Sequence, residues 1–462
     1  MISSSKDKGS FRDPSGFIFS RDGILYRQIN NSFKNDYTYL MNSGLYQDLV
    51  NNNLIIPHEE VEIEPHSAES SYKVIKPEKL AFITYPYEWC FSQYKRAALA
   101  TLEIQKTALS YDMTLKDAST YNIQFQDNNP LLIDTLSFEG YEQGRPWDGY
   151  HQFCKHFLAP LLLMSYCDVR LNSLMRVFID GLPLDIASSL LPKKTKYNLS
   201  IAAHIHIHAK AQKRYTGEEI NRKAISQRVR KEGVISLIDS LGHLIKKLAW
   251  GSEETSWGDY LSFHNYSDSA YKLKKALVQE FIEHANPGVV WDFGANTGEF
   301  SRLSSKKGIT TVAFDIDHGA VEQGYLQSIK EGDNHIHHSI IDLFNPSPCL
   351  GWNNSERKSL IKRGPTDLLM ALALVHHLAI GNNLPFELIG DFFSSLTNWL
   401  IIEFVPKEDS QVKKLLSSRR DIFENYTQAQ FEGAFSNYFS IVKKEPVKDT
   451  TRTLYLMKKL EV

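Results

Sequence analysis

The chain has 462 residues, of which 42% are hydrophobic and 23% are charged, the composition of a globular protein long enough for two or three domains. A formal net charge of −2 gives no overall bias towards nucleic acid or membrane, so nucleic acid is not an expected partner. None of the four cysteines belongs to a CxxC pair, which argues against a zinc knuckle or a disulfide scaffold. The polar N-terminus has no apolar signal core, and the longest apolar run, Phe157–Met164, is too short to span a bilayer. We therefore expect a soluble protein of the reducing cytoplasm.

The pattern of residues divides the chain into three zones. Residues 15–190 mix short strand-like runs with helical stretches and are predicted to form an α+β domain. Residues 191–264 are predicted to form a helical, basic linker, because ten lysines and arginines stand against four acids between Lys210 and Lys247. Residues 265–462 alternate strands and helices regularly, which is the pattern of an α/β sheet.

Two features of the middle zone allow more than one interpretation. The basic segment could face nucleic acid or an anionic membrane, but apolar residues recur at helical spacing in 234–250, which favours a solvated helix with one packed face. His204, His206 and His208 alternate and would share one face of a strand, where they could chelate a metal. Because no nearby cysteine or pair of acids completes such a site, solvated or packed histidines are expected and no metal is.

Five strands are expected in the last zone, separated by helices or loops. They are predicted at residues 288–294, 310–316, 335–342, 367–374 and 399–406. Two further runs, at 438–447 and 451–459, are separated by a polar turn and predict a closing β-hairpin.

A glycine-rich turn follows the first of these strands. In the stretch VVWDFGANTGEFS, a β-branched run ends in Asp292, and Gly294, Asn296 and Gly298 follow at every second position. Gly294 allows a tight turn and a close approach of the backbone to a ligand. A dinucleotide site would usually carry GxGxxG to hold a pyrophosphate. An acid at the strand end would repel a pyrophosphate, but it suits a ligand with an ammonium or sulfonium group.

Acidic residues also end the next two strands. Asp315 lies 17 residues after Gly298, a spacing at which an acid accepts hydrogen bonds from ribose hydroxyls. Asp342 follows the third apolar run and could receive the exocyclic amine of an adenine. A positive centre, a ribose and an adenine together describe S-adenosylmethionine (SAM).

On these motifs, residues 265–462 resemble a class I SAM-dependent methyltransferase. The resemblance implies a doubly wound, Rossmann-like sheet of seven strands that ends in an antiparallel hairpin. It also implies a cofactor-capping helix at 264–281, with Tyr266 and Ser267 near the SAM. The implied cofactor-binding set comprises Asp292, Gly294, Asn296 and Gly298 around the methionine moiety, Asp315 at the ribose and Asp342 at the adenine. The alternative is an unrelated α/β protein, since glycine-rich turns after strands occur in many of them.

The acceptor side of such a site would lie after the fourth strand. The run ALALVHHLAIG lacks the Asn/Asp-Pro-Pro-aromatic motif often found in methyltransferases that modify base amino groups. His376 or His377 could instead act as general base for a hydroxyl, or could simply pack under the loop. Glu403 is a second candidate base or acceptor ligand, although in-line positioning without a base is also an option. The amino-acid sequence of this region resembles that of bacterial nodulation-type or glycan-modifying methyltransferases, which implies a small-molecule or glycan acceptor.

A second resemblance concerns the N-terminal half. The stretch LKDASTYNIQF places Asn122 five residues after Asp117, and Asp134 follows a further apolar run. This spacing resembles the catalytic loop of protein-kinase-like phosphotransferases. It implies a kinase-like fold over 15–190, in which Asp117 aligns the acceptor hydroxyl and the other two hold Mg²⁺ with ATP.

The same region departs from the kinase pattern. Only Gly16 and Gly23 lie near the expected glycine-rich loop, the turn after Asp134 has no glycine, and Arg27 is the nearest basic residue to the expected strand lysine. Because phosphoryl transfer depends on charge placed around the nucleotide, these departures favour a degenerate domain that binds the acceptor or a partner. The alternatives are an active kinase, making the chain bifunctional, and an unrelated α+β domain.

Overall fold

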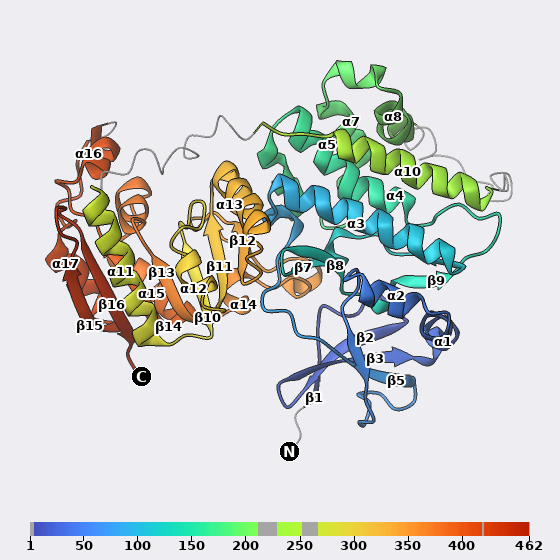
Figure 1. Ribbon diagram of the computed structural model, residues 1–462, viewed down its shortest axis with the longest axis horizontal. Helices are drawn as coiled ribbons and strands as arrows, with labels where there is room; N and C mark the ends of the chain where they lie inside the picture. The colour runs from blue at the N-terminus through green and yellow to red at the C-terminus, as the bar shows by residue number, and fades with distance from the viewer. Residues whose placement is uncertain (1–3, 211–228, 252–266, 418–419, 462) are drawn as a thin grey trace. The chain divides into compact units, whose positions relative to one another are not determined.

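The computed structural model describes residues 4–210, 229–251, 267–417 and 420–461 (Figure 1). The chain forms two compact units. The first comprises Met1–Trp250 and Cys349–Arg357, and the second comprises Gly251–Pro348 and Lys358–Val462. No helix among the described residues has both the length and the apolar character needed to cross a membrane.

The first unit begins with a five-stranded antiparallel sheet and two helices. The strands in spatial order are β1 (Ser4–Lys6), β2 (Gly16–Arg21), β3 (Ile24–Asn30), β5 (Ser71–Pro77) and β4 (His58–Glu60). The helices α1 (Lys34–Asn42) and α2 (Leu45–Asn51) follow β3. Two short antiparallel pairs come later, formed by β6 (Met113–Leu115) with β9 (Phe138–Gly140) and by β7 (Ile123–Gln126) with β8 (Asn129–Leu132).

The remainder of the first unit is helical. Its elements are α3 (Phe91–Ser110), α4 (Tyr150–Phe153), the π-helix η5 (Cys154–Leu158), α5 (Ala159–Tyr166), α6 (Leu174–Val177), α7 (Leu184–Leu190), the 3₁₀ turn η7 (Lys193–Tyr197), α8 (Leu199–Ile201), the π-helix η8 (Ala202–Ile207) and α10 (Lys231–Lys247). Helices α3 and α10 lie side by side in Figure 1.

Helix α10 corrects the predicted domain boundary. Its apolar residues at helical spacing, among them Val234, Ile238, Leu241 and Ile245, are buried in the core of the first unit. The described parts of the predicted linker 191–264, up to residue 250, therefore belong to this unit. The linker was predicted from the many basic residues of this segment. The position of the helix is instead decided by its apolar face, which packs into the core of the first unit.

The second unit is built on a seven-stranded sheet. In spatial order its strands are β12 (Ile336–Ile340), β11 (Thr310–Asp315), β10 (Val289–Phe293), β13 (Thr366–Ala371), β14 (Thr397–Phe404), β16 (Thr453–Lys459) and β15 (Phe439–Pro446). The first five are parallel, and β16 runs antiparallel to both of its neighbours. The mixed α/β class expected from the sequence is confirmed.

Helices cover both faces of this sheet. They are α11 (Asp268–Ala285), α12 (Arg302–Ser305), α13 (His318–Glu331), α14 (Leu360–Arg363), α15 (Phe386–Leu396), α16 (Ser410–Ser417) and α17 (Gln428–Phe435). Alternation along β10 separates the two faces. Val290 packs in a cluster with Phe281 of α11, whereas the ring of Phe293 lies 6.0 Å from that of Phe393 in α15.

The strand order creates a crevice. The chain passes from β10 to β11 and β12 on one side and then returns to place β13 on the other side of β10. At such a switch point the loops leaving the carboxyl ends of adjacent strands diverge, and open α/β sheets bind ligands there.

Candidate functional site

A cavity of about 270 Å³ lies at this switch point. Its lining comes from the loops that follow β10, β11, β12 and β13, namely Gly294, Asn296, Asp315, Ile316, Ile341, Asp342, Leu343, Phe344, Leu372, Ala373, Leu374, His377, Leu378 and Asn382. The predicted residues Gly294, Asn296, Asp315, Asp342 and His377 are thus brought together. Tyr266 lies outside the described residues, and Asp292, Gly298, His376 and Glu403 do not line this cavity.

The loop after β10 is held against β11 by backbone hydrogen bonds. The N–H groups of Gly294 and Ala295 both donate to the carbonyl of Phe314 at 2.9 Å. Gly294 has φ +71° and Asn296 has φ +52°, conformations that glycine and asparagine tolerate better than other residues. A Cβ at Gly294 would also lie 3.3 Å from Leu374 of the loop after β13. The small residue therefore keeps the crevice open.

Asp315 connects this loop to the cavity. Its Oδ2 accepts the N–H of Asn296 at 2.7 Å, and its Oδ1 accepts the N–H of Asp317 at 2.9 Å. Burial raises the pKa of Asp315 to about 6, although the backbone donors favour the charged form. The carboxylate is oriented by the backbone and still lines the cavity.

Asp292 and Gly298 do not line the cavity, and the ligand contacts that the family resemblance implied for them stay a prediction. Asp292 is 2% exposed and accepts a hydrogen bond from Ser301 Oγ at 2.6 Å, and burial raises its pKa to about 7. Gly298 has φ +81°, and a Cβ there would lie 3.1 Å from the ring of His338. Asp292 thus holds Ser301 from within β10, and Gly298 leaves room for the His338 ring.

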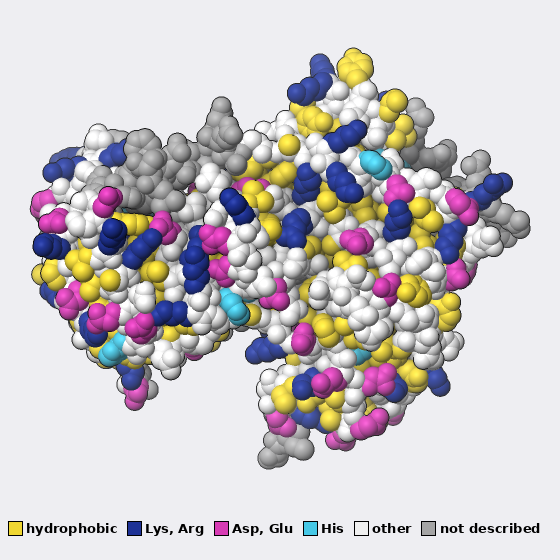
Figure 2. All heavy atoms as spheres, viewed as in Figure 1, with side chains coloured by type: hydrophobic (Ala, Val, Ile, Leu, Met, Phe, Trp, Pro, Cys, Tyr) yellow, Lys and Arg dark blue, Asp and Glu magenta, His cyan; other side chains and the backbone are white. Residues whose placement is uncertain are grey.

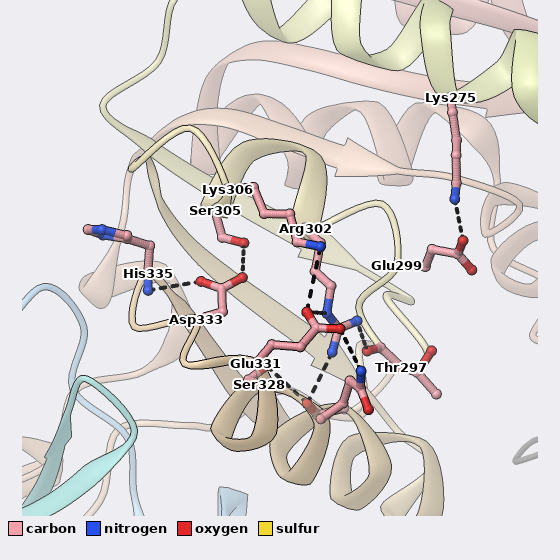
Figure 3. Close-up of polar contacts among 12 residues, drawn as sticks. Lys275, Thr297, Glu299, Arg302, Ser305, Lys306, Ser328, Glu331, Asp333 and His335 are labelled. Atoms are coloured by element: carbon pink, nitrogen blue, oxygen red, sulfur yellow. Dashed lines mark hydrogen bonds and ion pairs between the residues drawn. The ribbon is translucent and has the colours of Figure 1, made fainter.

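Arg302 supports the outer side of the same loop, as Figure 3 shows. Its Nη1 donates to the carbonyl of Thr297 at 2.7 Å, and its Nη2 donates to the carbonyl of Gly324 in α13 at 3.2 Å. Glu331 lies 3.6 Å from the guanidinium Nε. Two larger surface hollows flank these residues, about 470 and 560 Å³ in volume, but charged and amide side chains dominate their lining. Arg302 thus fixes the loop from outside the cavity.

One end of the cavity is flanked by two large apolar side chains that the sequence analysis did not single out. Ile316 follows β11 and is 58% exposed, and Phe344 follows β12 and is 50% exposed. Asp342 Oδ1 accepts the N–H of Phe344 at 2.8 Å, which ties the acid to the aromatic residue. The sequence signal that could have identified the two apolar side chains is a large apolar residue one or two positions after an acidic strand end, Ile316 after Asp315 and Phe344 after Asp342. Together the three side chains suit a flat, apolar ring that carries an amine.

The opposite end of the cavity is formed by the loop after β13. His377 lines the cavity and begins the π-helix η12 (His377–Gly381), an irregularity often found at functional sites. Burial lowers the pKa of His377, and Arg452 adds to the effect, so the imidazole stays neutral near pH 7. The ring of His376 lies 4.2 Å from that of His377 but is 1% exposed. Only the second histidine of the pair is therefore placed to meet a ligand.

Glu403, the second candidate base or acceptor ligand, is fully buried and does not line the cavity. Its Oε2 accepts hydrogen bonds from Lys274 Nζ of α11 and from the N–H of Ala373, both at 2.7 Å. Ala373 has φ +48°, a conformation that is strained for alanine. Arg452 lies 3.9 Å from the other carboxylate oxygen and is itself paired with Asp409 at 2.8 Å. Glu403 therefore positions the loop that carries His377.

The kinase-like residues also come together in the first unit. The side chains of Asn122 and Gln152 hydrogen-bond the Asp117 carboxylate, Gln152 at 2.7 Å. Burial raises the pKa of Asp117, and the nearby charge of Asp134 raises it further. Arg27 of β3 forms an ion pair with Asp134 at 2.6 Å.

The three alternating histidines lie on the π-helix η8 and on the residue after it, not on a strand. His204 and His208 both hydrogen-bond the hydroxyl of Tyr150, at 2.8 and 3.1 Å. His206 bonds Ser188 and Thr195. Across the described ranges, no group of three or more histidine, cysteine or acidic residues is arranged to hold a metal ion.

A nodulation protein resembles nearly the whole chain. Over 459 residues the chain is 32% identical to the nodulation protein NoeA of Rhizobium meliloti (strain 1021), and the alignment covers 98% of this chain and 96% of NoeA. The chain belongs to the NoeA family. No family model matches the sequence.

Several solved structures resemble parts of this NoeA-family chain weakly. The N-methyltransferase NodS from Bradyrhizobium japonicum aligns at TM-score 0.31 and 9% identity, over 42% of this chain and 99% of NodS. The magnesium protoporphyrin IX methyltransferase ChlM from Synechocystis, with bound S-adenosylhomocysteine (SAH), aligns at TM-score 0.30 and 19% identity. The alignment covers 41% of this chain and 84% of ChlM. The bifunctional kinase-methyltransferase WbdD aligns at TM-score 0.30 and 16% identity, over 48% of this chain and 46% of WbdD. The match thus spans less than half of WbdD.

Proposed function

We propose that the chain is a SAM-dependent methyltransferase whose catalytic domain is 265–462. The observation that carries this proposal is the cavity at the switch point, where a glycine turn and two acidic strand ends converge on one space. The first unit, which contains the kinase-like region 15–190, is proposed to bind the acceptor or a partner.

The residues around the cavity fit SAM. Gly294 presents backbone without a side chain, Asp315 presents a carboxylate suited to ribose hydroxyls, and Asp342 lies with Ile316 and Phe344 where an adenine would be held. When bound, SAM supplies an electrophilic methyl group. The protein then has to orient the acceptor in line with that group and exclude water.

The acceptor is proposed to be a hydroxyl of a small molecule or a glycan. His377 lines the cavity and is held neutral, so an imidazole nitrogen can take the proton that the acceptor hydroxyl releases. A glycan-type acceptor is what the resemblance to nodulation-type or glycan-modifying methyltransferases implied, and the family of this chain includes a nodulation protein.

Calorimetry with S-adenosylhomocysteine tests the cofactor assignment. We expect Asp315→Ala to weaken binding by about a hundredfold or more, because two hydrogen bonds to a charged acceptor contribute about 1.5–3 kcal/mol each. Asp391→Ala, which removes an exposed carboxylate from α15, is the matched control and should bind as wild type does. No heat of binding for wild type, or equal affinity for the two variants, would remove the proposal.

The same titration has a predicted pH dependence. The pKa of Asp315 is about 6 in the free protein, and ribose hydroxyls donate to the ionised form. Affinity should therefore be constant above about pH 7 and fall by about tenfold per unit below pH 6. Asp315→Asn should flatten this profile, and a profile with the opposite sign would show that the ligand prefers the protonated acid.

Replacing His377 tests the acceptor chemistry. Transfer from labelled SAM to a panel of metabolites and glycans would first identify a substrate. We then expect His377→Ala to lower kcat by about 10²–10⁴, the usual contribution of a general base, while the affinity for S-adenosylhomocysteine changes by less than about threefold. Unchanged kcat would mean that orientation alone drives the transfer.

A second candidate function is phosphotransfer by the first unit, using Asp117 as base with Asn122 and Asp134 on the metal. The convergence of these three side chains favours it. Against it, the Asp134 carboxylate is already paired with Arg27, so the residues as arranged do not fit a divalent cation.

We therefore expect ATP to give the wild-type protein no Mg²⁺-dependent thermal stabilisation. The measurement is a thermal-shift titration with ATP, in the presence and absence of Mg²⁺. A Mg²⁺-dependent shift that is lost in Asp134→Asn but kept in Asp36→Asn, an acid of α1 outside this cluster, would instead establish a bifunctional kinase-methyltransferase.

A further inference from the structure

Four large apolar side chains gather on one helical part of the first unit and face solvent. Tyr197 is 88% exposed, Leu199 87%, Ile207 61% and Leu190 49%. We call these four residues the apolar tip. The four residues lie on α7, η7, α8 and η8, and η8 contacts each of the other three elements. Exposed large apolar residues on neighbouring elements commonly mark an interaction site.

Hydrogen bonds of His206 connect the elements beneath the apolar tip. His206 is 5% exposed and its ring bonds two elements at once, Ser188 Oγ of α7 at 2.8 Å and Thr195 Oγ1 of η7 at 3.0 Å. Ser188 precedes Leu190 by two residues, Thr195 precedes Tyr197 by two, and His206 is next to Ile207. A single buried imidazole therefore ties together α7, η7 and η8, the elements that carry Leu190, Tyr197 and Ile207. The apolar side chains are therefore exposed on segments that are held in place by hydrogen bonds.

The surroundings of the apolar tip are positively charged. Lys193, Lys194 and Lys196 are exposed within the same turn, and residues 186–210 contain four lysines and no acid. Figure 2 shows hydrophobic and basic side chains together at the end of the molecule that carries α7 and α8. The net charge of the whole chain is only −2, so this is a local concentration of positive charge.

We propose that the apolar tip and its three lysines dock the protein on an anionic lipid bilayer. Leucine and isoleucine side chains are suited to the acyl boundary, and tyrosine is suited to the headgroup level. Lysine ammonium groups complement lipid phosphates, each contributing about 1 kcal/mol near such a surface. Nucleic acid fits less well, because three of the four tip residues are aliphatic and offer no ring for base stacking.

This docking surface is independent of the proposed methyl transfer. It lies in the first unit, and none of its residues lines the cavity proposed to bind SAM. A protein that fails to bind S-adenosylhomocysteine could still bind vesicles, and the reverse also holds. The two proposals can therefore fail separately.

Co-sedimentation of the full chain with vesicles tests the proposal. We expect binding to vesicles of phosphatidylcholine with about 30% phosphatidylglycerol, because this anionic lipid gives the bilayer a negative surface potential. Binding to phosphatidylcholine alone should be much weaker. Leu199→Ser should weaken binding by about tenfold or more, because it removes one inserted apolar side chain. Each Lys→Gln change at 193, 194 or 196 should weaken it by about fivefold, and added salt should weaken it further.

Matched controls keep this test specific. Ile24→Ser removes an apolar side chain that is 45% exposed on the β2–β3 hairpin, and Lys76→Gln removes an exposed lysine of β5. Both should bind vesicles as wild type does. Equal binding by Leu199→Ser and Ile24→Ser, or no preference for the anionic lipid, would overturn the proposal.

Sedimentation velocity without lipid addresses the competing occupant, a second copy of the chain. We expect the oligomeric state to be the same for wild type and Leu199→Ser. A wild-type dimer that Leu199→Ser converts to a monomer would show that the apolar tip is covered by another copy, and the bilayer proposal would be withdrawn.

Discussion

Replacing Lys274 by methionine is expected to destabilise the second unit by about 3–5 kcal/mol, the usual cost of removing one partner from a buried ion pair. Lys274 and Glu403 are 3% and 0% exposed at their side chains, and their atoms lie 2.7 Å apart. Without the lysine, the buried Glu403 carboxylate would keep only Arg452 as a counter-ion, at 3.9 Å and shared with Asp409, or would take up a proton and release Ala373 from its strained conformation. Hydrogen exchange of β14 and α11 should accelerate, while β2 and β3 of the first unit serve as an internal reference.

The neighbouring lysine supplies the control for this experiment. Lys275 pairs with Glu299 at the surface, where the two side chains are 33% and 29% exposed. Lys275→Met should therefore cost no more than about 1 kcal/mol. The double variant Lys274→Met/Glu403→Leu should recover part of the loss, because it leaves no unpaired buried charge. Equal effects of the two lysine substitutions would contradict this role for the buried pair.

Replacing Gly324 by alanine is expected to lower the affinity for S-adenosylhomocysteine by about tenfold or more, although Gly324 does not line the cavity. A Cβ at this position of α13 would lie 2.7 Å from the ring of His338 and 2.8 Å from the carbonyl of Thr297. Overpacking of this kind costs about 1–3 kcal/mol. Relief by shifting Thr297 would displace Asn296, whose N–H orients Asp315 at 2.7 Å. Calorimetry measures the affinity, and hydrogen exchange measures the loosening of the loop.

Gly433→Ala is the matched helical control. This glycine lies in α17, and an added Cβ would meet nothing within 4 Å. The substitution should leave the affinity unchanged and should stabilise the helix slightly, by up to about 1 kcal/mol. If Gly324→Ala bound the ligand as tightly as Gly433→Ala, the glycine loop would not depend on the packing behind it.

The parts of the candidate site that could be predicted are those encoded over short distances. Gly294, Asn296 and Asp315 were recognisable because a strand, a glycine turn and an acidic strand end follow one another within 26 residues of chain, from Val290 to Asp315. The carboxyl ends of parallel neighbours then have to meet at one edge of the sheet. The same reasoning brought Asp117, Asn122 and Asp134 together, since they lie within one loop and the strands that follow it.

The parts that failed depend on partners far away in the chain. Glu403 was a candidate base or acceptor ligand, but Lys274 pairs with it from a helix 129 residues earlier. Arg27 was noted only as the nearest basic residue, yet it neutralises Asp134 from a strand 107 residues away. The predicted linker was assigned by its charge, whereas the apolar face of α10 joins it to the first core.

The sequence by itself determined the mixed α/β class of the second unit, the loops that form its cavity and the acids that end its strands. These follow from backbone preferences and from hydrophobic periodicity, which act between residues close together in the chain. Tertiary structure alone decided which acids line the cavity, which histidine lines it and which buried charged groups have a partner of opposite charge. Those outcomes depend on side-chain direction and on the exclusion of water, and both arise only when distant elements pack against one another.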